Sequence, residues 1–188
     1  MNLPNKLTIL RIIMVPVAVA MLLIEFPYHW LCGLIVFALA SFTDMLDGHI
    51  ARKHHMVTDF GKFADPLADK ILVFSVLICF LDAHLASTVV VIVLLFREFL
   101  VTAVRLSAAA GGKVVPASFC AKAKTVSQMV AIIIALLLMQ AHAIWPAALS
   151  ADLVFWVSEG LLWVSAVFSI VSGVQYVIHN WEFIKTAK

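Results

Sequence analysis

Two pairs of aspartates are the residues of this sequence best suited to chemistry. Asp44 and Asp47 are three positions apart, and Asp65 and Asp69 are four positions apart. In an α-helix, residues at these spacings lie on one face, so each pair directs two carboxylates the same way. Carboxylates that converge at one place cannot all stay ionised without cations, and hard divalent ions with oxygen ligands meet that need. The spacing predicts a site for Mg²⁺ or Mn²⁺, with two ions about 3.5–4 Å apart that promote displacement at phosphorus.

Small and basic residues accompany the first pair. Gly48 lies four positions after Asp44, and Ala51 lies four positions after Asp47. These small side chains leave room for a nucleotide beside the carboxylates, and Arg52 can neutralise a phosphate. The alternative is that the aspartates only form ion pairs with nearby lysines at the rim of a membrane, an arrangement that would not require small neighbours.

The elements that position these residues must be membrane helices. Of the 188 residues, 64% are hydrophobic and 13% are charged, and the mean hydropathy is +1.07. About 20 residues cross the hydrocarbon layer as a helix, and long apolar stretches cover 7–24, 30–49, 66–83, 86–109, 125–142 and 153–179. This composition excludes a soluble globular domain, a disordered tail, a disulfide-stapled secreted module and a nucleic-acid-binding protein.

We therefore expect an all-α integral membrane protein of six transmembrane helices, embedded in the lipid bilayer as a single domain over residues 1–188. We also expect Pro66 to lie in the first turn of the third helix, where a proline is well tolerated.

The positions of the basic residues give the orientation. None of the 13 Lys and Arg residues falls in the segments 25–29, 82–86 and 143–152, which join spans on one side. The positive-inside rule then places both termini in the cytoplasm. Asp44 follows Trp30 by about 21 Å of helix, so the aspartate pairs and the active site are expected at the cytoplasmic face.

Residues 44–69 resemble the signature of a known family. They read DMLDGHIARKHHMVTDFGKFADPLAD and fit the pattern D-x2-D-G-x2-A-R-x8-G-x3-D-x3-D at all eight fixed positions. This pattern is that of the CDP-alcohol phosphotransferases, also called CDP-alcohol phosphatidyltransferases, and the likeness extends along most of the chain. Other segments resemble the bacterial members that use glycerol 3-phosphate, namely Asn5-Lys6-Leu7-Thr8 with Arg11, Arg97-Glu98, Arg105, and Lys122-Ala123-Lys124-Thr125 followed by Gln128.

The resemblance implies roles for individual residues. Asp44, Asp47 and Asp65 resemble metal ligands, and Asp69 resembles a general base that also contacts metal. The positions that resemble the CDP-diacylglycerol-binding residues are Asn5, Thr8, Gly48, Ala51, Arg52, Thr58 and Gly61. The implied reaction transfers a phosphatidyl group from CDP-diacylglycerol to glycerol 3-phosphate, with phosphatidylglycerophosphate and CMP as products. The family likeness also implies a homodimer, located in the bacterial inner membrane.

Cations of the fourth span and of the segment after it indicate the acceptor. Arg97 lies near mid-depth, where an unpaired guanidinium is unfavourable, although Glu98 can partly neutralise it. With Arg105, Lys122 and Lys124, it forms a basic cluster suited to an acceptor that carries its own phosphate. The alternative is the same fold and chemistry with inositol phosphate, serine or phosphatidylglycerol as acceptor. One departure bears on this assignment, since Cys120-Ala121 stands where the family favours glycine before the first lysine.

Other polar residues are assigned no chemistry. His49, His54 and His55 lack tetrahedral spacing and are expected not to bind metal. The three cysteines lack metal-site spacing, and Cys32 and Cys79, which lie in apolar spans, are expected to pack. A small cation transporter is a remote alternative. It would need carboxylates near the midplane and a path to both faces. Segments 30–41 and 74–81 contain no acidic or basic side chain to continue such a path.

Overall fold

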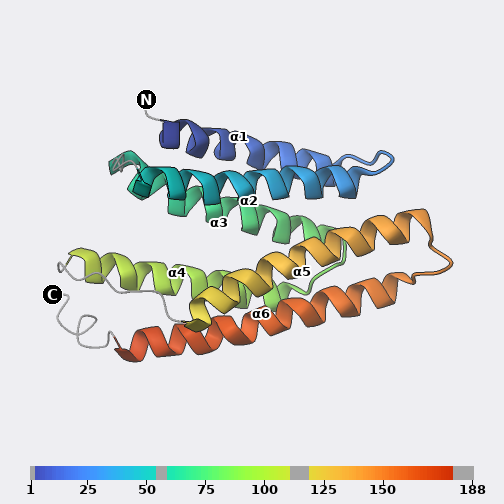
Figure 1. Cartoon of the computed structure of the whole chain (residues 1–188). Coiled ribbons are helices and arrows are strands. Elements are labelled where there is room, and N and C mark those ends of the chain that lie inside the picture. The colour runs from blue at the N-terminus through green and yellow to red at the C-terminus, as the bar shows by residue number, and fades with distance from the viewer. Residues whose placement is uncertain (1–2, 54–58, 111–118, 180–188) are drawn as a thin grey trace. The chain divides into compact units, whose positions relative to one another are not determined.

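The protein is a chain of α-helices in this computed structural model. The structure describes the backbone of residues 3–53, 59–110 and 119–179, and the side chains of residues 7–43, 67–105 and 119–178. The helices, shown in Figure 1, are α1 (Leu3–Leu23), α2 (His29–Lys53), α3 (Asp59–Asp82), α4 (Thr88–Ala110), α5 (Phe119–Ile144) and α6 (Ala151–His179). The described residues contain no strand, which confirms the predicted all-α class.

The observed helices follow the predicted spans, with the largest difference at α3. This helix begins at Asp59 and runs through Pro66, so the expectation that Pro66 lies in a first turn is wrong. Residues 59–65 are too polar to count toward an apolar span, yet an aspartate at a helix start interacts favourably with the helix dipole. Helix α1 likewise contains an internal proline, Pro16, which membrane helices tolerate.

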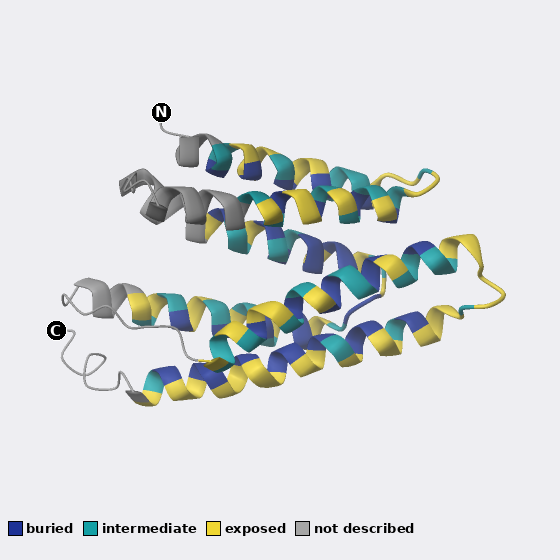
Figure 2. Ribbon diagram, viewed as in Figure 1, coloured by how far each residue is buried: buried dark blue, intermediate teal, exposed yellow. Residues whose placement is uncertain are grey.

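The helices expose apolar side chains. Trp156 and Ile178 on α6 are 68% and 70% exposed, and Figure 2 shows exposed positions along the length of this helix. Within the described residues, α5 and α6 are long and apolar enough to cross a membrane. These are features of a membrane protein, although the number of spans and the side of the termini stay predictions.

One compact unit comprises residues Met1–Ala83 and Leu136–Ala151. Helix α1 packs against both α2 and α3, and small residues at these contacts let the backbones approach closely. A Cβ at Gly33 of α2 would overlap the Leu22 side chain of α1, so a larger residue there would have to displace Leu22. Near the start of α2, the Leu31 amide donates to Gln140 Oε1 at 3.1 Å.

A second compact unit comprises His84–Ala135 and Asp152–Lys188. In it, α4 and α6 run parallel, because two contacts between them have the same separation of 72 residues, Ser87 with Glu159 and Arg97 with Ser169. Glu159 is only 6% exposed, and its carboxylate accepts from the Ser87 amide and from Trp163 Nε1, each at 2.8 Å. A buried carboxylate thereby accepts a hydrogen bond from a backbone amide at the beginning of α4 that has no partner within the helix.

Candidate functional site

Helices α2 and α3 carry the predicted aspartate motif. Asp44 and Asp47 fall in the second half of α2, and Asp65 and Asp69 fall in the first half of α3. The two helices contact each other within the first unit. Asp69 is half-buried. The side chains of the other three aspartates lie outside the described residues, so convergence of the carboxylates stays a prediction.

The chemistry of this donor set fits the expected cations. Every predicted ligand is a carboxylate, and oxygen donors of this kind suit Mg²⁺ or Mn²⁺ rather than softer metals. Among the described side chains, no group of three or more His, Cys, Asp or Glu residues is placed to hold a metal ion. The side chains of Asp44, Asp47 and Asp65 and of the histidines at 49, 54 and 55 lie outside the described residues.

One predicted nucleotide-binding residue is described with its side chain. Thr8 on α1 is fully buried, as is Arg11 one turn later. Helix α1 packs against both helices of the aspartate motif, and the role of Thr8 in nucleotide binding stays a prediction. The remaining members of the set lie outside the described side chains: Asn5, Gly48, Ala51, Arg52, Thr58 and Gly61.

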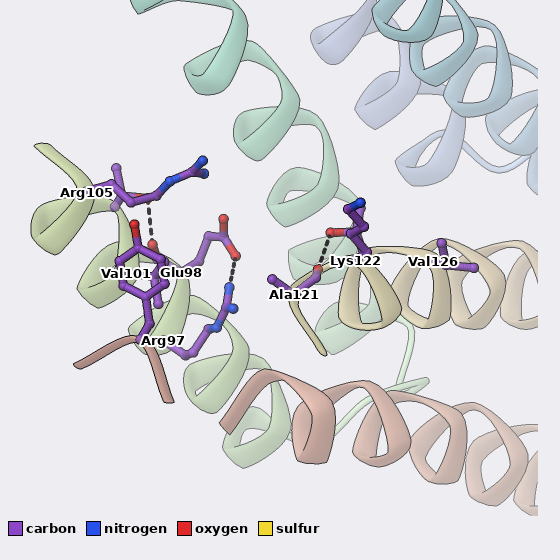
Figure 3. Close-up of a pocket in the computed structure, with 10 residues that line it drawn as sticks. Arg97, Glu98, Val101, Arg105, Ala121, Lys122 and Val126 are labelled. Carbon is purple, nitrogen blue, oxygen red and sulfur yellow. Dashed lines mark hydrogen bonds and ion pairs between the residues drawn. The ribbon is translucent and has the colours of Figure 1, made fainter. Parts of the chain in front are cut away.

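A pocket of about 400 Å³ lies within the second unit. It is lined by Arg97, Glu98, Val101, Thr102 and Arg105 of α4, Ala121, Lys122, Thr125 and Val126 of α5, and Tyr176 of α6 (Figure 3). Three of the four cations predicted to bind an acceptor phosphate are therefore in its wall, whereas Lys124 is not among the lining residues.

Arg97 is held from two helices at once. Its side chain is buried, with 7% of the residue exposed. Nε donates to the Ser169 carbonyl oxygen of α6 at 3.0 Å, and Nη2 donates to Ser172 Oγ at 2.5 Å. Nη1 donates to Glu98 Oε2 at 3.1 Å on α4 itself. These contacts compensate the burial of a guanidinium in an apolar setting.

Glu98 joins Arg97 to a second predicted cation. The same carboxylate oxygen, Oε2, accepts from Lys124 Nζ at 2.7 Å. Lys124 is also 7% exposed, and its carbonyl oxygen accepts from Ser165 Oγ of α6 at 3.3 Å. Glu98 and Lys124 thus connect α4 to α5 beside the pocket.

The remaining two cations have a different environment. Arg105 and Lys122 are exposed at the pocket, and neither forms an ion pair with any side chain that the structure describes. The four predicted cations therefore divide into a buried, paired set and an exposed set, a division that the sequence reasoning did not make.

Hydroxyl groups and a methyl group complete the pocket wall. Thr102 Oγ1 donates to the Glu98 carbonyl at 2.7 Å, and Thr125 Oγ1 donates to the Ala121 carbonyl at 3.2 Å. Ala121 itself lines the pocket, so the departure from the favoured glycine adds a methyl group to this wall.

The sequence reasoning missed the contribution of α6. Ser169, Ser172 and Gly173 surround the Arg97 side chain, and a Cβ at Gly173 would lie 3.1 Å from Arg97 Cγ. The available signal was the spacing of these small residues, which places them on one face of a helix.

Comparison with known proteins gives consistent matches. The model of the family described as CDP-alcohol phosphatidyltransferase matches residues 1–171. The CDP-diacylglycerol–glycerol-3-phosphate 3-phosphatidyltransferase of Bacillus subtilis is 42% identical over 199 aligned positions, covering 99% of this chain and 98% of the relative. The protein of that name from Rickettsia bellii is 41% identical, with 93% of each chain covered. A probable phosphatidylglycerophosphate synthase of Mycobacterium tuberculosis is 42% identical over 70% of this chain and 64% of the relative.

Proposed function

The chain belongs to the CDP-alcohol phosphatidyltransferase family, and we propose that it transfers a phosphatidyl group from CDP-diacylglycerol to glycerol 3-phosphate. The products are phosphatidylglycerophosphate and CMP, which makes the protein a transferase of phospholipid biosynthesis. The observation that carries the choice of acceptor is the basic pocket of the second unit, lined by Arg97, Arg105 and Lys122.

The charge of the pocket favours a phosphorylated acceptor. Glu98 is the only acidic residue among the described residues that line it, and this carboxylate is already bonded to Arg97 and Lys124. Arg105 and Lys122 then offer positive charge to a ligand, and a phosphate monoester carries nearly two negative charges to meet it. Serine has no phosphate, and phosphatidylglycerol carries a singly charged diester. Inositol phosphate shares the phosphate monoester and is the second candidate acceptor.

The aspartate motif is assigned to the donor. Asp44, Asp47, Asp65 and Asp69 would hold Mg²⁺ or Mn²⁺, with two ions as the expected number. When bound, these ions neutralise charge on the pyrophosphate of CDP-diacylglycerol. The CDP group is assigned to Asn5, Thr8, Gly48, Ala51, Arg52, Thr58 and Gly61.

The reaction is a single displacement at phosphorus. The Asp69 carboxylate accepts the proton of an acceptor hydroxyl, and the hydroxyl oxygen forms a bond to the β-phosphorus of CDP-diacylglycerol. The bond from this phosphorus to the oxygen of the α-phosphate breaks, and CMP leaves with the electron pair. Asp69 is half-buried on α3, an environment in which a carboxylate can serve as a base.

The same proposal includes the cellular setting. The absence of all 13 Lys and Arg residues from segments 25–29, 82–86 and 143–152 supports six spans with both termini in the cytoplasm. The active site then faces the cytoplasm from the bacterial inner membrane. A single domain over residues 1–188 and a homodimer complete the proposal.

One assay tests this function. Purified protein in detergent is given Mg²⁺ or Mn²⁺, CDP-diacylglycerol and one of several acceptors, and CMP release is measured. We expect release with glycerol 3-phosphate and little with serine or phosphatidylglycerol. Release with inositol phosphate alone would overturn the acceptor assignment, and no release with any acceptor would overturn the enzyme assignment.

A further inference from the structure

We propose that Gly173 and Ser172 of α6 are positioning residues that set the place of the Arg97 guanidinium in the acceptor pocket. The proposal rests on the proposed function, because Arg97 is assigned to the acceptor there. Neither α6 residue lines the pocket. Both act through Arg97, which does.

Gly173 provides the space that the arginine stem occupies. A Cβ built at this position would lie 3.1 Å from Arg97 Cγ and 3.7 Å from Arg97 Nε. The first distance is shorter than ordinary carbon–carbon contact, about 3.5–4.0 Å. Any side chain at this position therefore displaces the stem of Arg97, and a branched one displaces it further.

Ser172 presents an oxygen that can accept from the guanidinium. Its Oγ donates to the Ser169 carbonyl at 3.0 Å, so the hydroxyl hydrogen is committed within α6. The oxygen can then only accept further hydrogen bonds, and Arg97 Nη2 donates one to it at 2.5 Å. Because the Ser169 carbonyl also accepts from Arg97 Nε, α6 fixes the plane of the guanidinium as well as its position.

The stem of Arg97 therefore passes over Gly173 of α6 on its way to the pocket. Its rotation is restrained at Nε and Nη2 by α6 and at Nη1 by Glu98. A guanidinium binds a phosphate best when its planar N–H groups are aligned with the phosphate oxygens. Small residues at positions 172 and 173 thus determine acceptor affinity without contacting the acceptor.

Gly160 offers a matched control for the glycine. It lies on the same helix, and a Cβ there would meet no atom within 4 Å. Gly173→Ala and Gly160→Ala make the same change in helix propensity, so a difference between them reports the contact with Arg97. Gly173→Val and Gly160→Val extend the comparison to a larger side chain.

The test measures the KM for glycerol 3-phosphate and for CDP-diacylglycerol by CMP release. We expect Gly173→Ala to raise the acceptor KM about threefold and Gly173→Val about tenfold or more, while the KM for CDP-diacylglycerol changes less than about twofold. Both Gly160 variants should keep both constants near wild type. Ser172→Ala leaves the space at Gly173 unchanged but removes the oxygen that accepts from Nη2, and should also raise the acceptor KM several-fold. Ser172→Thr, which keeps a hydroxyl at this position, should have an acceptor KM closer to wild type than that of Ser172→Ala.

Binding measured without turnover separates this inference from the proposed function. Calorimetric titration of each variant with glycerol 3-phosphate should follow the same order as the KM values. If wild type binds glycerol 3-phosphate but releases no CMP, the proposed function fails while the titration still tests the α6 residues. An acceptor affinity unchanged in the folded Gly173 and Ser172 variants, or lowered equally in the Gly160 variants, would overturn the inference.

Discussion

Lys124 Nζ lies 2.7 Å from Glu98 Oε2, and this ion pair joins α5 to α4 beside the basic pocket. Its neighbour in sequence, Lys122, lines that pocket and forms no ion pair with the described side chains. Two lysines of one motif therefore have different environments, because residues two positions apart in a helix point in different directions.

This difference predicts that the same substitution affects acceptor binding at Lys122 and protein stability at Lys124. Lys122→Gln should raise the KM for glycerol 3-phosphate about tenfold and leave thermal stability near wild type, because an exposed charge is removed from the phosphate site. Lys124→Gln should instead lower the stability of the folded protein by about 2 kcal/mol, since it removes the charged hydrogen bond between a buried lysine and a half-buried carboxylate. Thermal unfolding in detergent and acceptor kinetics measure both quantities. Equal effects of the two substitutions on the KM would contradict the division.

The Glu98 carboxylate is expected to stabilise the fold by compensating the charges of Arg97 and Lys124. Glu98→Gln leaves Arg97 and Lys124 without the charge that compensates them, so we expect a loss of stability of about 2–4 kcal/mol. The double variant Glu98→Gln/Lys124→Met removes a buried charge together with its partner, and should be more stable than Glu98→Gln alone. Thermal unfolding of the wild type, Glu98→Gln, the single variant Lys124→Met and the double variant gives the coupling between the two positions. A coupling near zero would show that the 2.7 Å contact contributes nothing to stability.

The contact between Ser87 and Glu159 predicts a stability effect without an acceptor effect. Glu159→Gln keeps the shape of the side chain but removes the charge that stabilises the beginning of α4, at a cost of about 1–2 kcal/mol. Glu25→Gln, at an exposed acid outside this unit, is the matched control and should leave stability unchanged. Because Glu159 does not line the basic pocket, the acceptor KM should stay within about twofold of wild type. A selective rise in that KM would contradict this assignment.

Much of this organisation could be predicted from the sequence, and the rest depends on packing. Apolar length predicts the helices, and the spacing of Asp44 to Asp69 indicates the family, since these signals are local. The start of α3 at Asp59 was missed because polar residues there conceal the helix from a search for apolar spans. The role proposed for Gly173 could be predicted only in part, because the spacing of small residues indicates a helix face but not the partner, here Arg97, that packs against it.

Removal of divalent cations should abolish turnover reversibly. Incubation with EDTA is expected to stop CMP release, and added Mg²⁺ or Mn²⁺ should restore it, because the predicted ligands are all carboxylates. Asp44→Asn and Asp65→Asn should shift the restoring concentration upward by about tenfold or more. Activity that survives exhaustive EDTA treatment would contradict the metal site, and restoration by Zn²⁺ alone would contradict its assignment to hard cations.

Asp69 is predicted to act as the base, and α3 offers a control for it. Asp69→Asn should abolish CMP release while CDP-diacylglycerol binding stays measurable, because an amide cannot accept the proton of the attacking hydroxyl. Asp82→Asn makes the same change at the exposed end of the same helix and should keep wild-type turnover. Single-turnover CMP release separates chemistry from binding, and titration with CDP-diacylglycerol measures binding directly. A rate for Asp69→Asn within about tenfold of wild type would assign the base to another residue. Loss of CDP-diacylglycerol binding in that variant would instead assign Asp69 to holding the donor.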